Sequence, residues 1–331
     1  MIIARDEVIA LLNEFYLNGI YSLKVSSPLL KEIYRFELGN EPRLNAMTTD
    51  EYSEKYDSLR LRCEPEVVEE IPRPGEEYRW IFQSSGVVKP ENYSGIVREL
   101  ENEADRDFMR GDKPLYIGFD TNVLANRFPA IMPKVKCGFC LHTGVLDELH
   151  SKFIEKKIRR TKAQVLKRHG FKEVFNQPPL KARKFRVGAV EYRKLMRREY
   201  TDEIQGNPGD LNIVKDYQSY QKSRNVDVLL VSEDNIFVEI ANDHRIKAVH
   251  VKQAKDIPKR LNPTWQELTE LLYTTAIAYG VIKIGSVLMF GVWRGKTKED
   301  WNSERLKLEF MNGKLAAEMK RSFRILKACG S

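Results

Sequence analysis

Two short apolar runs, each followed directly by acidic residues, constrain the fold of this chain more than any other feature. Residues 115–119 (LYIGF) precede Asp120, and residues 226–232 (VDVLLVS) precede Glu233 and Asp234. Continuous apolar runs of this length predict strands that are covered on both faces of a sheet. A further strand is predicted at 248–253, and helical patterns occur at 143–158, 163–168, 189–200, 210–223 and 236–243. Strands that alternate with helices are typical of a parallel sheet flanked by helices, so we expect an α/β fold.

The N-terminal part of the chain predicts a separate domain. Residues 6–16 carry apolar residues at helical spacing, and three later runs resemble strands, at 21–25, 33–38 and 78–82. Gly and Pro residues interrupt the chain between these runs, which is typical of turns. We therefore expect residues 1–110 to form a mixed α/β domain, and no motif in it indicates a chemistry.

The chain changes character again from about residue 257. Residues 262–279 predict an amphipathic helix that ends at Gly280. Residues 281–297 and 304–310 alternate like antiparallel strands, and the candidate turns between them are Arg294-Gly295 and Asn312-Gly313. We expect residues 257–331 to form this helix and a small β-rich C-terminal region.

Trp293 and Lys296 in this region combine an aromatic ring with a cation, as proteins that bind single strands do. A hairpin turn with a Trp at the sheet edge explains the same residues equally well. Cys137 and Cys140 have the spacing of zinc ligands, but Cys63 and Cys329 are isolated and supply no second pair. Packed thiols are therefore the favoured interpretation.

The bulk composition bounds the class of protein. The chain has 331 residues, of which 42% are hydrophobic and 31% are charged, so a globular protein is expected. No run approaches the roughly 18 apolar residues of a membrane span. The first residues include acids by position 6 and do not resemble a signal peptide. We expect a cytoplasmic protein with no membrane partner, and the sequence is compatible with a homo-oligomer.

Positive charge is concentrated between residues 156 and 198. This stretch holds 16 Lys or Arg and two Glu, a net charge of +14, so the rest of a chain of net charge +8 carries −6. Such a stretch attracts a polyanion, because its cations release counterions from phosphates. A solvated basic face is the alternative interpretation. The cations expected to bind nucleic acid are Lys156, Lys157, Arg159, Arg160, Lys162, Lys167, Arg168, Lys181, Arg183, Lys184 and Arg186.

Four acidic residues are candidates for one site. Asp120 and Asp234 follow strands whose carboxyl ends border the crevice where open parallel sheets place functional groups. Asp210 stands at the start of a predicted helix, and Glu148 lies in a helix that begins near the same edge. Converging carboxylates repel one another unless a cation lies between them, and oxygen ligands suit Mg²⁺ or Mn²⁺. Taken singly, Asp120 and Asp210 could be helix caps, and Glu148 a solvated helix residue.

Four motifs in this part of the chain resemble the PIN-domain nuclease family. They are IGFDTNVL at 117–124, LDELHSK at 146–152, GDLNIVKDY at 209–217 and VLLVSEDNIFVEIA at 228–241. The resemblance covers about residues 114–253 and implies a PIN-like parallel sheet flanked by helices within residues 111–256, with a basic insert at 156–198. A departure from the family is the gap of 62 residues from Glu148 to Asp210, which contains the insert.

The resemblance also implies roles for individual residues. The acidic, metal-holding and catalytic positions fall on Asp120, Glu148, Asp210 and Asp234, and the polar positions that support them fall on Thr121, Asn122 and Ser232. Asp147 beside Glu148 and Glu233 beside Asp234 remain alternatives from the residues alone. Successive helical residues point about 100° apart, so one of Asp147 and Glu148 faces the site, and the family pattern selects Glu148.

We therefore expect a Mg²⁺- or Mn²⁺-dependent nuclease that hydrolyses phosphodiester bonds. By resemblance to the family, single-stranded or structured RNA is the first-choice substrate, and DNA is the enzymatic alternative. A non-catalytic nucleic-acid-binding or scaffold protein with the same fold is the third interpretation. The presence of all four acids counts against that last interpretation.

Overall fold

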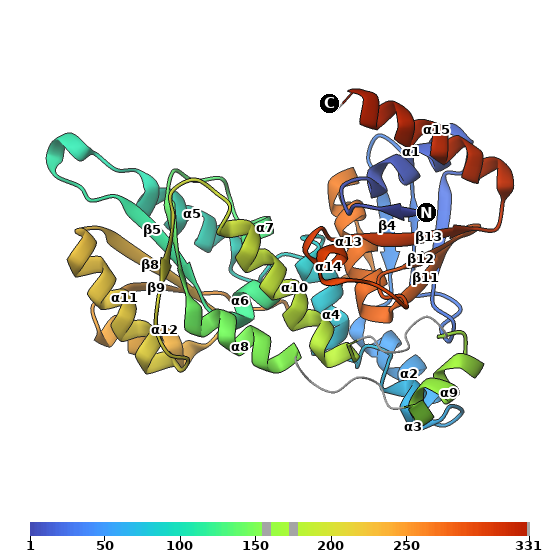
Figure 1. Ribbon diagram of the computed structural model, residues 1–331, viewed down its shortest axis with the longest axis horizontal. Helices are drawn as coiled ribbons and strands as arrows, with labels where there is room; N and C mark the ends of the chain where they lie inside the picture. Colours follow the sequence, from blue (N-terminus) through green and yellow to red (C-terminus); the bar gives the residue numbers. More distant parts are fainter. Residues whose placement is uncertain (154–159, 172–177, 330–331) are drawn as a thin grey trace. The chain divides into compact units, whose positions relative to one another are not determined.

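The chain forms two compact units, each made of more than one chain segment (Figure 1). The computed structural model describes residues 1–153, 160–171 and 178–329. The first unit has its described residues within 1–88, 156–180 and 256–331, and the second has them within 89–155 and 181–255. No helix among the described residues is long and apolar enough to span a bilayer.

This division differs from the three consecutive domains that the sequence predicts. The N-terminal and C-terminal parts share the first unit, because their strands pair in one antiparallel sheet. Strand β2 (Ser22–Ser26) pairs with β11 (Val281–Ile284), which places Val25 opposite Ile284. Local sequence patterns reveal each strand but not a partner so far away along the chain.

The second unit is built on a five-stranded parallel sheet in the order β7-β6-β5-β8-β9. Its strands are β5 (Leu115–Phe119), β6 (Gly138–His142), β7 (Thr201–Ile204), β8 (Asp227–Ser232) and β9 (Lys247–His250). The two apolar runs of the sequence are β5 and β8, which lie side by side at the centre. The predicted parallel sheet flanked by helices is therefore confirmed.

Helices lie on both faces of this sheet. They are α5 (Tyr93–Ala104), α6 (Thr121–Ala125), α7 (Phe128–Ile131), α8 (Thr143–Phe153), α10 (Leu180–Leu195), α11 (Asp210–Arg224) and α12 (Asn235–Asp243), with a short 3₁₀ turn η1 (Phe108–Arg110). Helices α11 and α12 cover one face, and α6, α8 and α10 cover the other (Figure 1). This is the arrangement that right-handed crossovers give when the chain first moves outward from β5 and then returns to β8.

Two strands of the parallel sheet are not predicted from the sequence. Strand β6 is short but fully buried, and it follows Cys137 directly. Strand β7 has the sequence TDEI and lies at the sheet edge, where only Ile204 is buried. An edge strand with polar side chains lacks the apolar pattern by which the central strands are recognised.

The first unit contains an eight-stranded antiparallel sheet in the order β1-β13-β12-β11-β2-β3-β4-β10. The remaining strands are β1 (Ile2–Ile3), β3 (Tyr34–Glu37), β4 (Arg43–Ala46), β10 (Arg260–Leu261), β12 (Val287–Phe290) and β13 (Leu306–Phe310). Its helices are α1 (Val8–Leu17), α2 (Thr49–Arg60), α3 (Pro65–Val68), α4 (Glu76–Ser84), α9 (Arg160–Arg168), α13 (Trp265–Tyr279), α14 (Lys298–Asn302) and α15 (Gly313–Cys329).

Helix α13 is the centre of this unit. It contacts α1 and α4 as well as β11 and β12, and all residues from Leu268 to Tyr279 except Glu270 are buried. The sequence predicts the helix correctly, including its end at Gly280, whose φ of 74° suits glycine. The amphipathic character is wrong, because α13 is covered on nearly every side.

Two further local predictions for this unit are wrong, and one predicted turn is confirmed. Residues 78–82 lie in α4 rather than in a strand, since Tyr78, Ile81 and Phe82 recur at helical spacing on a buried face. Arg294-Gly295 forms a turn after β12, closed by a hydrogen bond of 3.1 Å from the Lys296 N–H to the Trp293 carbonyl, while the β11–β12 hairpin itself turns at Gly285-Ser286. The C-terminal region also ends in a helix, α15, rather than being β-rich throughout.

The Trp293 and Lys296 stretch is structural in this unit. Lys296 is only 8% exposed, and its Nζ lies 4.5 Å from the centre of the Trp293 ring and 4.1 Å from that of the Trp301 ring. The same ammonium donates hydrogen bonds to the carbonyl oxygens of Gly291 and Arg305. Aromatic rings and carbonyls thus compensate this buried cation, and the stretch offers no exposed stacking platform.

We expect Gly118→Ala to destabilise the second unit. Gly118 lies in β5, and a Cβ there would stand 2.7 Å from Leu230 Cδ2 and 2.8 Å from the Tyr217 ring. Overpacking of this kind costs about 1–3 kcal/mol, measured here by urea unfolding. Gly95→Ala in α5 is the matched control, because nothing lies within 4 Å of its Cβ position. The control should gain about 0.5–1 kcal/mol from helix propensity, and equal effects of both substitutions would contradict the close packing.

Candidate active site

The candidate site lies where the strand order of the parallel sheet reverses. From β5 the chain moves outward to β6 and β7 and then returns to β8 on the other side of β5. Phe119 at the end of β5 pairs with Val231 of β8, and the Asp120 N–H donates to the Val231 carbonyl at 3.1 Å. The carboxyl ends of β5 and β8 therefore meet at the switch point, where open α/β sheets place their ligands.

Asp120 is the most buried acid of the site, with 7% of its surface exposed. Its Oδ1 accepts a hydrogen bond from the Thr121 N–H at 2.5 Å, and its Oδ2 accepts one from the Ser232 hydroxyl at 3.0 Å. Burial raises the pKa of Asp120 to about 6, the two hydrogen bonds oppose the rise, and the charges of Asp210 and Glu148 add to it. The carboxylate is thus fixed in position and still poorly compensated.

Ser232 joins the two strand-end acids. Its side chain is fully buried at the end of β8, and its Oγ donates to Asp120 while accepting from the Asp234 N–H at 2.9 Å. Asp234 caps α12, because its Oδ1 accepts from the Ile236 N–H at 2.8 Å. One hydroxyl therefore fixes the position of Asp234 relative to Asp120.

Glu148 approaches the same place from α8. Its Oε2 accepts from the Thr121 hydroxyl at 2.6 Å, and its Oε1 accepts from the Gly209 N–H at 3.1 Å. Asp147, its neighbour, is exposed, and its charge acts on Tyr192 rather than on the strand-end acids. Of the two acids of α8, Glu148 is the one that lies beside Asp120.

Asp210 completes the set from the start of α11. It follows Gly209, whose φ of 105° requires glycine, and this turn directs the first residue of the helix. Burial raises the pKa of Asp210, the charges of Glu148 and Asp234 raise it further, and Lys152 opposes the rise. The charge of Glu148 raises the pKa of both Asp120 and Asp210, and the charge of Asp234 raises that of Asp210. The four carboxylates therefore form one electrostatic group.

Two other polar residues have different surroundings. Both carboxylate oxygens of Glu233 accept hydrogen bonds of 2.6 Å from the side-chain amide of Asn126, at the end of α6. The charge that raises the pKa of Asp210 is that of Asp234, the neighbour of Glu233. Asn122 is half-buried in α6, directly after Thr121. Thr121 and Ser232, in contrast, donate hydrogen bonds directly to Glu148 and Asp120.

All four acidic side chains offer oxygen, the donor atom that Mg²⁺ and Mn²⁺ prefer. Burial is the main cause of the raised pKa values of Asp120 and Asp210, and the charges of neighbouring carboxylates add to it. As they lie, the carboxylates do not form a finished coordination shell. Within the described parts of the chain no group of three or more His, Cys, Asp or Glu side chains is gathered to hold a metal ion.

The expected nucleic-acid-binding cations are divided between the two units. The described residues of the insert belong to two units, with α9 in the first and most of α10 in the second. Lys156, Lys157 and Arg159 lie outside the described residues, while Arg160 and Lys181 fall in α9 and α10. Lys167 and Arg168 are exposed on α9, and Lys184 and Arg186 are half-buried on α10.

Two of these cations have other surroundings than predicted. Arg183 is only 1% exposed, so its guanidinium cannot meet a polyanion at the surface, and the prediction for this residue is wrong. Lys162 pairs with Glu69 at 2.9 Å and with Glu70 at 3.1 Å, which fixes α9 on α3. The sequence shows that these residues are cationic, but it does not show that Arg183 is buried or that Lys162 forms ion pairs within the first unit.

The sequence does not predict the pair of His142 and Asp216, which lie close to Glu148 and Asp210 along the chain. His142 is the buried last residue of β6, and its Nε2 lies 3.0 Å from Asp216 Oδ2 in α11. The run GFCLH followed by Thr143 is the one signal for it, since it has the strand-then-polar pattern of β5. With β6 unpredicted, the histidine had no assigned place.

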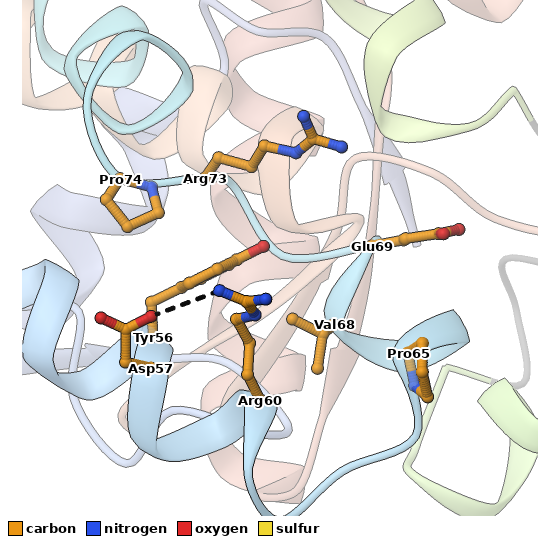
Figure 2. Close-up of a pocket in the computed structure, with 8 residues that line it drawn as sticks. All are labelled: Tyr56, Asp57, Arg60, Pro65, Val68, Glu69, Arg73 and Pro74. Carbon is orange, nitrogen blue, oxygen red and sulfur yellow. Dashed lines mark ion pairs between the residues drawn. The ribbon is translucent and has the colours of Figure 1, made fainter.

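A cavity with a volume of about 630 Å³ lies elsewhere, in the first unit. Figure 2 shows its lining, formed by Tyr56, Asp57, Arg60, Pro65, Val68, Glu69, Arg73 and Pro74. Two arginines and two acids line it, so it has no net charge, and Arg60 pairs with Asp57 at 3.7 Å. The cavity therefore selects no ligand class and contains none of the four carboxylates.

Comparison of the chain with protein-family models, with curated proteins and with solved structures gives no match.

We expect Asp120→Asn to stabilise the protein above about pH 6 and not below about pH 4. Because the folded protein raises the pKa of Asp120 from 3.8 to about 6, folding takes up a proton between these values and stability falls as pH rises through them. The gain at neutral pH is at most about 3 kcal/mol. Urea unfolding with a chelator measures it, with Asp147→Asn as the exposed control. A gain that is independent of pH would contradict the raised pKa.

Proposed function

We propose that this chain is a divalent-metal-dependent nuclease with a PIN-like catalytic unit. One observation supports the proposal above the others: carboxylates from four separate segments share one electrostatic group at the switch point of a parallel sheet. A protein that used these acids only as helix caps would not need to raise the pKa of Asp120 and Asp210 by burial and mutual repulsion. Perturbed acids of this kind concentrate at functional sites.

Each residue of the site has a distinct role in the proposal. Asp120 and Asp234 would hold the ion from the two strand ends, and Glu148 and Asp210 would complete its shell directly or through water. The Thr121 and Ser232 hydroxyls keep Glu148 and Asp120 oriented, as residues behind metal ligands commonly do. Asn122 would support the same edge from α6. When bound, Mg²⁺ or Mn²⁺ activates water and offsets the charge that develops on a phosphate.

The substrate part of the proposal depends on charge and on the family resemblance. Lys167 and Arg168 are exposed cations of the basic insert, and a phosphate backbone is the polyanion that such cations attract. RNA, single-stranded or structured, is the proposed substrate because the resembling family favours it. DNA cleavage and binding without cleavage are the alternatives that the assay below separates.

We expect the protein to cleave labelled single-stranded RNA with Mn²⁺ or Mg²⁺ and to lose cleavage with a chelator. Asp120→Asn and Asp234→Asn should each lower the rate by at least about 100-fold, since each removes a charged ligand. Asp147→Asn and Glu148→Gln form a matched pair on α8, of which the first should stay active and the second should not. The measurement is the initial cleavage rate at saturating metal.

The outcomes of this assay are decisive in both directions. Cleavage that persists with chelator, or an unimpaired Asp120→Asn, would overturn the metal mechanism. Cleavage of DNA in preference to RNA would change the substrate class and keep the site. Metal binding without cleavage of either polymer would favour the non-catalytic scaffold protein.

We expect reversal of charge at Lys167 and Arg168 to weaken RNA binding and to flatten its dependence on salt. Each lost phosphate contact lowers the slope of log affinity against log salt by about 0.7–0.9. Fluorescence anisotropy with labelled RNA at several salt concentrations measures both quantities. Charge reversal at Lys314 and Lys320 of α15 changes net charge equally and is the control. If both double variants lose affinity alike, net charge rather than α9 is responsible.

A further inference from the structure

The loop between β7 and α11 is hydrogen-bonded to the first turn of α8. Thr143 Oγ1 accepts from the Gly206 N–H at 3.0 Å and donates to the Gly206 carbonyl at 3.2 Å. Glycines lie where the two segments meet: a Cβ on Gly144 would lie 2.7 Å from the Asn207 carbonyl oxygen, and one on Gly206 would lie 2.1 Å from Asp216 Oδ2. Glycine at position 144 therefore allows the close approach to the Asn207 backbone, and glycine at position 206 leaves room for the Asp216 side chain.

His142 and Asp216 lie beside this contact, and the hydrogen bonds of the imidazole define which ring nitrogen carries the proton. His142 Nδ1 accepts from the Gly144 N–H at 3.0 Å, so this nitrogen carries no proton. The ring proton must then be on Nε2, which donates to Asp216 Oδ2 at 3.0 Å. The imidazole thus joins the start of α8, through Gly144, to the second turn of α11, through Asp216.

These two helices carry half of the candidate site. Glu148 lies on α8 and Asp210 is the first residue of α11, and the Gly209 N–H at the end of the hydrogen-bonded loop donates to Glu148 Oε1 at 3.1 Å. We propose that the His142–Asp216 pair is a positioning element that holds Glu148 and Asp210 side by side for the ion. The inference rests on the proposed function, because it assigns a task within that same site.

A purely structural histidine is the competing explanation. Such a pair would add stability to the unit, and its loss would not alter how tightly the folded protein binds a cation. The positioning role makes a narrower claim, namely that the acceptor atom at position 216 controls the loop and the metal affinity together. Conservative and non-conservative substitutions of Asp216 distinguish the two explanations, and Asp216 is partly exposed, at 38% for its side chain, so its replacement leaves the core intact.

The experiment compares Asp216→Ala, Asp216→Asn and Tyr220→Phe in the full-length protein. The asparagine retains an oxygen that can accept from His142 Nε2, whereas the alanine does not. Tyr220→Phe is the matched control, because it removes a hydrogen bond of 2.7 Å to Asp202 from the same helix. Mn²⁺ affinity is titrated by electron paramagnetic resonance, and hydrogen exchange of the peptide spanning 205–210 is followed by mass spectrometry with chelator.

We expect Asp216→Ala to weaken Mn²⁺ binding by about 10-fold or more and to accelerate exchange at residues 205–210. Asp216→Asn and Tyr220→Phe should stay within about 3-fold of the parent protein in both measurements. Equal affinity and equal exchange in Asp216→Ala would overturn the inference, as would equal losses in all three variants.

The two proposals fail in different ways. If the parent protein binds no Mn²⁺, the proposed function falls, and the exchange measurement still tests the pair. Faster exchange confined to Asp216→Ala would then support its hold on the loop, and unchanged exchange would overturn it.

Discussion

The parallel pairing of β5 with β8 is the contact on which the rest of the second unit depends. It runs from Leu115 opposite Asp227 to Phe119 opposite Val231, and both strands are almost fully buried. Because parallel strands end at the same edge, this register places Asp120 beside Ser232 without any further adjustment. A shift by one residue would turn the alternate side chains of β8 to the opposite face and separate the two strand ends.

The buried carboxylate of this site lowers the stability of the second unit. Asp120 is buried beside like charges, and its raised pKa means that its ionised form is less stable in the folded chain than in water. The continuous apolar core under the sheet, which includes Ile117, Leu229 and Tyr217, outweighs this cost. The Thr121 N–H and the Ser232 hydroxyl reduce the cost without removing it, and under the proposed function a bound cation would offset the remainder.

The sequence predicts β5, β8 and β9 of the parallel sheet and misses β6 and the edge strand β7. The strands β5 and β8 and the acids after them are recognisable because buried parallel strands need continuous apolar runs. Strand β7 carries TDEI, and nothing in that pattern distinguishes an edge strand from a loop. From the residues alone Asp147 and Glu148 are alternatives, and only the family resemblance selects Glu148; the structure adds its contacts with Thr121 and Gly209. The pairing of β2 with β11 joins parts of the chain that no local pattern connects.

Because the chain between Glu148 and Asp210 is long, side-chain contacts are needed to hold these two residues in position relative to each other. The residues between Glu148 and Asp210 include α9, which belongs to the first unit, so the connection between α8 and α11 is not a short loop that could fix their geometry. A connection of this length imposes little orientation on α8 and α11 by itself. Orientation must then come from the pairing of β7 with β6 and from the bonds of Thr143 and His142 to the segment before and within α11. The insert is tolerated because these contacts, rather than chain connectivity, bring Asp210 to Glu148.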